Sequence, residues 1–169
     1  KVSPCLTLNG TALQWCDNVK HLGNTLTWNL SDTKDLQLKR GELAGRTNTM
    51  LGTLNCLSGD ILMKVFASKC CHYYGCQTWQ FSQSTVKYYS TMWNRCVRRL
   101  LNLPNTTHCR YLSQLAGITS PHDQICHSFL KLLYTMLNSD NKIVKFIAER
   151  AVKDHRTIIS GNINYIETV

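Results

Sequence analysis

The chain has 169 residues, of which 43% are hydrophobic and 17% charged, enough apolar material to bury a core in one domain or two small ones. No apolar run approaches the roughly 20 residues of a membrane-spanning helix, and no signal-peptide pattern opens the chain, so we expect a soluble protein with no membrane partner. The formal net charge is +9. A basic field attracts polyanions, and nucleic acid is the commonest of these, although a basic face kept for solubility explains the charge equally well.

The basic charge is concentrated in the middle of the chain. Between Ser58 and Arg110 the only acid is Asp60, and this segment carries +6 of the net charge of +9. Its bases are Lys64, Lys69, Lys87, Arg95, Arg98, Arg99 and Arg110.

The nine cysteines favour neither a disulfide framework nor a zinc site. Their number is odd, and no C-x2-C pair occurs. Cys70, Cys71 and His72 are contiguous, and consecutive ligands rarely converge on one tetrahedral ion. We therefore interpret the cysteines as buried thiols of a protein in a reducing compartment, the nucleus or the cytoplasm.

Short strands are predicted at the start of the chain. Residues 6–15 form a hairpin that turns at Asn9-Gly10, the strongest short-range hairpin signal. Asp17-Asn18 is predicted as a further turn, and residues 19–26 as a second strand pair with Gly23 at a bend or a close backbone approach.

From Ser31 onwards, apolar residues recur at the spacing typical of a helix. A first helix, capped by Ser31 or Asp32, carries apolar residues from Leu36 to Leu57. Ser58-Gly59-Asp60 caps a second helix that Gly75 ends. The inward positions of this second helix are Ile61 or Leu62, Val65, Phe66, Cys70 and Tyr73, with Lys64 and Lys69 outside the stripe.

A third helix is predicted from Ser84 to Asn102, before Pro104. Its inward stripe is Val86, Tyr89, Trp93, Cys96 or Val97, and Leu100, with Arg95, Arg98 and Arg99 on its other side. A short helix then ends at Gly117, and Ser120-Pro121-His122-Asp123 starts a longer one. A last amphipathic helix runs from about Ile143 to Val152, and the tail from Arg156 is weakly specified. The expected fold is α+β and predominantly α-helical, with short N-terminal β-hairpins followed by a helical bundle.

Autonomous catalysis is not expected from these residues. The chain has only 10 acids, and Asp32 and Asp35 fall in a first helical turn, where acids usually serve the cap and the helix dipole. The six histidines show no metal-site spacing, and no glycine-rich phosphate loop occurs. We predict no catalytic residue, no metal ligand and no cofactor.

Two binding signals remain. The helix from Val86 to Leu101 interleaves aromatic residues with arginines, which can neutralise phosphates without regard to sequence, while Tyr89 and Trp93 are expected in the core. The second signal is the turn Lys20-His21-Leu22-Gly23, where a glycine allows close approach of the backbone. The predicted nucleic-acid-binding residues are Lys20, His21, Leu22, Gly23, Lys64, Lys69, Lys87, Arg95, Arg98 and Arg99.

Motifs in a fixed order carry a resemblance to a family. Leu6-Thr7-Leu8-Asn9-Gly10 and then Val19-Lys20-His21-Leu22-Gly23-Asn24-Thr25-Leu26-Thr27-Trp28 resemble the end of the palm in LINE-type reverse transcriptases. Tyr73-Tyr74-Gly75 with Trp79, and the segment from Trp93 to Pro104, are similar to later motifs of that family, whose members belong to non-LTR retrotransposons of jockey-like and related clades. Thr106 to Leu112 and Ser160 to Ile166 are similar to its downstream region.

The resemblance implies a division of the chain. Residues 1–30 would be the end of the palm with the primer-grip hairpin, residues 31–104 a helical thumb, and residues 105–169 a helical connector. The partner would be an RNA–DNA or DNA duplex, together with fingers and palm upstream on the same polypeptide. The aspartates that bind Mg²⁺ in this family lie in an "(F/Y)-A-D-D" box and on an earlier strand, and this sequence has no such box. The chain is therefore expected to be a non-catalytic part of an RNA-directed DNA polymerase. A helical protein-interaction module and a transposon remnant without function are the alternatives.

Overall fold

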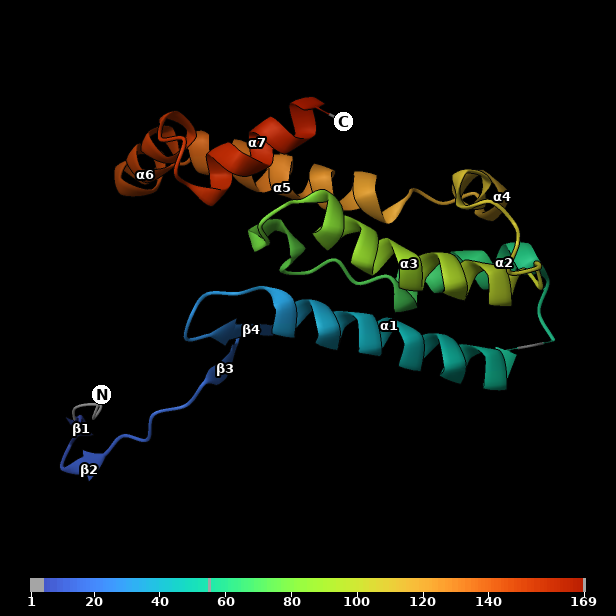
Figure 1. Ribbon diagram of the computed structural model, residues 1–169, viewed down its shortest axis with the longest axis horizontal. Helices are drawn as coiled ribbons and strands as arrows, with labels where there is room; N and C mark the ends of the chain where they lie inside the picture. The colour runs from blue at the N-terminus through green and yellow to red at the C-terminus, as the bar shows by residue number, and fades with distance from the viewer. Residues whose placement is uncertain (1–4, 55, 169) are drawn as a thin grey trace.

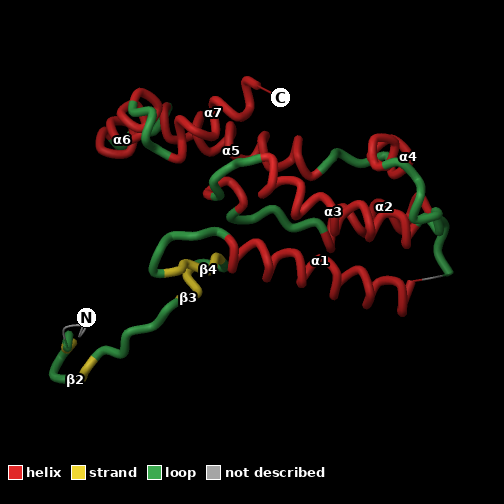
Figure 2. Tube along the Cα trace, viewed as in Figure 1, coloured by secondary structure: helices red, strands yellow, loops and turns green. Residues whose placement is uncertain are grey.

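The structure, a computed structural model, describes residues 5–54 and 56–168. Two small antiparallel hairpins precede a set of packed helices, which confirms the α+β, predominantly helical fold (Figure 1). Within the described residues, all strands lie between Thr7 and Thr27, and the first hairpin lies away from the helices at the end of an extended segment (Figure 2).

Both hairpins turn through two residues with positive φ, the geometry that matches the twist of paired strands. Strands β1 (Thr7–Leu8) and β2 (Thr11–Ala12) are joined by Asn9 and Gly10, at φ 51° and 79°. Strands β3 (Asn18–His21) and β4 (Asn24–Thr27) are joined by Leu22 and Gly23, at φ 46° and 81°. The predicted turn at Asp17-Asn18 is confirmed only as a bend at Asp17, because Asn18 already pairs with Thr27 in the ladder.

The helical core is built on α1 (Thr33–Leu54) and α3 (Gln83–Leu100), which pack against each other (Figure 1). Helix α2 (Gly59–Val65) continues into a π-helical turn, η1 (Phe66–Cys70), which packs on α1. The predicted second helix therefore ends earlier than Gly75, which instead lies in a turn at φ 84° before a 3₁₀ turn, η2 (Cys76–Thr78).

The C-terminal third begins with a 3₁₀ turn, η3 (Cys109–Tyr111), and α4 (Leu112–Ala116), which Gly117 ends at φ 63° as predicted. Helix α5 (Pro121–Leu137) has Ser120 as its N-cap, with the hydroxyl accepting from the Asp123 N–H at 3.2 Å. Helix α6 (Lys142–Lys153) follows. The weakly specified tail forms an additional helix, α7 (Ile158–Thr168), which packs on the core through apolar residues such as Ile159 and Ile163.

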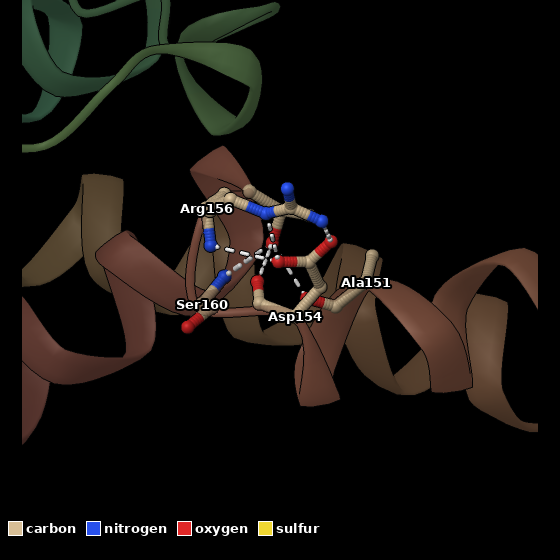
Figure 3. Close-up of polar contacts among 5 residues, drawn as sticks. Ala151, Asp154, Arg156 and Ser160 are labelled. Carbon is tan, nitrogen blue, oxygen red and sulfur yellow. Dashed lines mark hydrogen bonds and ion pairs between the residues drawn. The ribbon is translucent and has the colours of Figure 1, made fainter.

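Polar contacts close the turn between α6 and α7 (Figure 3). The Arg156 guanidinium donates to both carboxylate oxygens of Asp154, at 3.0 and 3.1 Å. The Thr157 hydroxyl donates to the Ala151 carbonyl and accepts from the Ser160 N–H. The turn thus satisfies backbone groups that the end of one helix and the start of the next leave unpaired.

Aromatic side chains from several elements meet in the core. Tyr89 and Trp93 of α3 are almost fully buried, which confirms their predicted place. The Phe66 ring lies 6.4 Å from the Trp93 ring, and Trp79 lies 6.0 Å from Tyr89, between ring centroids. In α2 it is Leu62 rather than Ile61 that is buried, and in α3 both Cys96 and Val97 are.

Candidate nucleic-acid interface

The tip of the second hairpin carries the first group of predicted residues. Lys20, His21 and Leu22 are all exposed there. The hairpin is fixed to α1 because the buried Asp35 carboxylate accepts a 2.9 Å hydrogen bond from the Thr25 backbone N–H. The tip is thereby held at the N-terminal end of α1.

Lys39 and Tyr74 lie beside this tip. The Lys39 ammonium is 3.5 Å from the Gly23 carbonyl oxygen and 5.9 Å from the centre of the Tyr74 ring. Gly23 lies in the bend of the turn, at φ 81°, as one of the two predicted alternatives has it. A β-carbon there would meet the Tyr74 ring at 3.4 Å, which is an ordinary van der Waals contact with a side chain. The tighter approach is at Gly75, where a β-carbon would lie 1.8 Å from the Asn24 side-chain oxygen.

Helix α3 contributes an exposed basic side. Lys87, Arg95 and Arg99 are exposed, and α3 contains no acid. Arg98 departs from the prediction, because its side chain is partly buried and donates to the Thr107 carbonyl from Nε at 3.0 Å and from Nη2 at 2.7 Å. This arginine holds the loop after α3 rather than extending from the exposed side.

Two further contacts join this side of α3 to α1. Arg99 donates to the Asn48 side-chain oxygen at 2.7 Å. The Arg40 guanidinium lies 4.2 Å above the centre of the Tyr88 ring. Arg40 was not among the predicted residues, because it lies in α1, before the segment whose charge pointed to binding.

A groove lies on the opposite edge of α1, between α1 and the α2–η1 segment. Its volume is about 580 Å³, and its floor includes Met50, Leu54 and Cys70. Arg46 and Lys69 also line it. Arg46 is 3.6 Å from Glu42 in an exposed pair, which in water holds the guanidinium only weakly.

Three glycines lie on the exposed side of α1, between the groove and Asn48. Gly41, Gly45 and Gly52 are spaced by four and seven residues, one and two helical turns, so they share one side of the helix. A β-carbon at any of them would meet nothing within 4 Å. Internal packing therefore does not require glycine there, although each one weakens the helix.

The predicted residues thus fall into separate groups. The side of α1 that carries Gly41, Gly45 and Gly52 is called the glycine side below. Arg99 borders one edge of it, where it binds Asn48. Arg46 and Lys69, which line the groove, border the other edge. Lys20, His21 and Leu22 stand at the hairpin tip, and Lys64 is exposed on α2.

Acids are scarce around these cations. Residues 61–122 contain seven Lys and Arg and no Asp or Glu. The buried Asp35 carboxylate accepts hydrogen bonds from Thr25 and Trp79. The Asp32 carboxylate accepts one from the Gln80 N–H at 2.6 Å, and burial raises the pKa of Asp32. The expectation that these two acids serve the cap and the dipole of α1 is therefore incomplete: Asp35 does lie in the first turn of α1, but both side chains also accept hydrogen bonds from other segments and tie them to α1.

Within the described residues, no group of three or more His, Cys, Asp or Glu could hold a metal ion. All nine cysteines are free. Cys70, Cys76, Cys96 and Cys126 are buried, as predicted, and burial raises the pKa of Cys76 to about 12. The others differ: Cys71 is half-buried, and Cys5, Cys16, Cys56 and Cys109 are exposed.

Among residues 5–54 and 56–168, no helix has both the length and the hydropathy that crossing a lipid bilayer requires. Comparisons with protein-family models, curated proteins and solved structures found no match. The function is therefore inferred from the motifs and from the geometry of the basic residues around α1.

Proposed function

We propose that this chain grips a nucleic-acid duplex without regard to sequence, as the thumb part of a LINE-type RNA-directed DNA polymerase. The observation that carries the proposal is the glycine side of α1, which lies between cations on both edges of the helix. Gly45 itself lines the groove with Arg46 and Lys69, and Asn48 beside it holds Arg99.

Such a helix side suits the minor groove of an RNA–DNA hybrid. An A-form helix has a wide, shallow minor groove that displays sugar hydroxyls and is bordered by two phosphate backbones. Glycines let the α1 backbone approach the sugars, and the flanking cations would meet a phosphate backbone on each side. Because those contacts are to sugar and phosphate, they carry no sequence preference.

The hairpin tip supports a role at one end of that duplex. Lys20 and His21 are exposed there, and Lys39 stands against Gly23. By resemblance this is the primer grip. The cross-strand pair Val19 and Leu26 is also exposed, as expected if an upstream palm of the same polypeptide covers the hairpin. Catalysis with Mg²⁺ would belong to aspartates outside this chain.

The test is binding of the full chain to a fluorescently labelled RNA–DNA duplex over a range of salt concentrations. Two double variants remove charge from the proposed interface: Arg95→Ala/Arg99→Ala and Arg46→Ala/Lys69→Ala. Each should lower the affinity and make it depend less steeply on salt concentration. If the hybrid behaves as B-DNA does, the slope of log affinity against log salt should become shallower by about 0.9 for each phosphate that is no longer neutralised. Lys142→Ala/Lys145→Ala removes the same charge from α6 and is the control. Equal loss in all three variants, or in none, would contradict the assignment.

A second candidate function is that of a helical protein-interaction module, and the exposed apolar side of α6 supports it. Ile143, Phe146 and Ile147 are large, exposed and spaced three and four residues apart on one side of that helix. If the wild-type chain binds no duplex at low salt, this function is preferred over the first. Phe146→Ser would then be the variant to compare with wild type for loss of partner binding.

A further inference from the structure

Tyr88 is an exposed aromatic residue on the basic side of α3. The residue is 39% exposed, while its neighbour Tyr89 is buried in the core. Arg95 is seven residues and Arg99 eleven residues after Tyr88, so the three side chains follow one another along one side of the helix. At 1.5 Å rise per residue, Arg95 lies about 10 Å and Arg99 about 16 Å beyond Tyr88 along the axis.

The Tyr88 ring is held in place from α1. The Arg40 guanidinium lies 4.2 Å above the ring centre, a stacked cation–π arrangement. Glu42, the nearest acid in the sequence, is two residues further along α1 and pairs with Arg46 on the other edge, so it does not draw Arg40 away. Tyr88 and Arg40 thus form a cation–π stack at the surface.

We propose that this stack binds an unpaired base of a nucleic-acid strand that leaves the duplex, with Arg95 and Arg99 contacting the phosphates of the same strand. Aromatic rings and arginine planes are the surfaces on which proteins stack single-stranded bases. Phosphate contacts alone, as on a duplex, need no exposed aromatic ring. The inference rests on the proposed function and adds to it a specific site, the Tyr88–Arg40 stack, at which the unpaired part of one strand would bind.

The experiment compares two probes with the full chain: a blunt RNA–DNA duplex, and the same duplex with a single-stranded RNA overhang that contains 2-aminopurine. Wild type should bind the overhang probe about fivefold or more tightly than the blunt one, and should quench the 2-aminopurine fluorescence. Tyr88→Leu should abolish both the preference and the quenching while leaving affinity for the blunt duplex within about twofold. Tyr88→Phe keeps the ring and should keep both effects.

Equal wild-type affinity for the two probes, or a preference that survives Tyr88→Leu, would overturn the stacking site and leave the duplex grip intact. Absence of wild-type binding to either probe would overturn the proposed function and this inference together. Circular dichroism of each variant checks that the helices are retained. If Tyr88→Leu fails to fold, Arg40→Ala serves instead, because it removes the supporting plane and should also reduce the preference.

Discussion

The Asp35 carboxylate accepts a 2.9 Å hydrogen bond from the Trp79 indole N–H, which joins the first turn of α1 to a loop 44 residues later. The other carboxylate oxygen accepts from the Thr25 backbone N–H. One buried side chain therefore fixes the β3–β4 hairpin, α1 and the loop before α3 relative to one another. The position of the hairpin tip, with Lys20 and His21, depends on this carboxylate.

Replacing Asp35 by Ala should destabilise the fold strongly. Two buried donors, the Thr25 N–H and the Trp79 indole, would lose their acceptor, and each unsatisfied donor costs about 1–3 kcal/mol. We expect the free energy of unfolding in urea to fall by roughly 2–5 kcal/mol. Asp140→Ala, at an exposed position, is the control and should change it by less than about 0.5 kcal/mol. Similar stability of the two variants would show that water replaces the Asp35 contacts.

Asn162 of α7 should be equally sensitive. Its side chain is fully buried, its oxygen accepts from the Phe81 N–H at 2.7 Å, and its amide donates to the Trp79 carbonyl at 2.8 Å. Asn162→Ala leaves both backbone groups unpaired and should lower the free energy of unfolding by about 2–4 kcal/mol. Asn162→Asp keeps the acceptor but loses the donor to Trp79, and should also destabilise. Asn164→Ala, on the exposed side of the same helix, should have little effect, and a comparable loss of stability there would contradict the argument.

These two residues mark the limit of what the sequence predicts. Local patterns predicted the helices and the turn at Asn9-Gly10, because helical period, caps and glycine signals act within a few residues. The roles of Asp35 and Asn162 depend on partners 44 and 83 residues away, respectively, which no local pattern contains. The helix of the tail was missed for the same reason, since its apolar side is defined by the core on which it packs.

The candidate interface was predicted in part. The charge pattern along the chain identified Lys69, Arg95 and Arg99, because a run of bases without acids is visible in one dimension. It assigned Arg98 to the same surface, although that side chain turns to the Thr107 carbonyl. It missed Arg40 and Arg46, since only the packing of α1 beside α3 and η1 brings them next to the predicted cations.

Alanine at the α1 glycines should separate stability from binding. Gly45→Ala and Gly52→Ala add a methyl group into open space and raise helix propensity, so each should stabilise the fold by about 0.5–1 kcal/mol. If the glycine side faces a minor groove, the same variants should weaken duplex binding. Thermal unfolding and duplex titration of the same samples measure both effects.

Gly75→Ala is the matched control for the glycine variants. Its φ of 84° and a contact of 1.8 Å between the new β-carbon and the Asn24 side chain should make it destabilising. Unchanged duplex affinity in Gly45→Ala/Gly52→Ala would remove the glycine side from the interface.

One half-buried and one buried thiol should make the fold sensitive to alkaline pH. Burial raises the pKa of Cys71 and of Cys76 from 9.0 to about 12. Because the folded pKa is raised, the stability that these protonated thiols contribute is fully present below pH 9 and is lost as the pH rises from 9 towards 12. In that window the unfolded chain releases protons that the folded chain retains, so the free energy of unfolding should fall by up to about 1.4 kcal/mol per pH unit for each thiol.

Urea unfolding under reducing conditions from pH 8 upwards measures the slope of the free energy of unfolding against pH. The double variant Cys71→Ala/Cys76→Ala should flatten this slope. The control Cys5→Ala/Cys16→Ala, at exposed positions, should not. A slope that the first pair leaves unchanged would assign the alkaline loss of stability to other groups. The half-buried Tyr73 and the buried Tyr89, whose phenol pKa values are also raised by burial, are next to be tested.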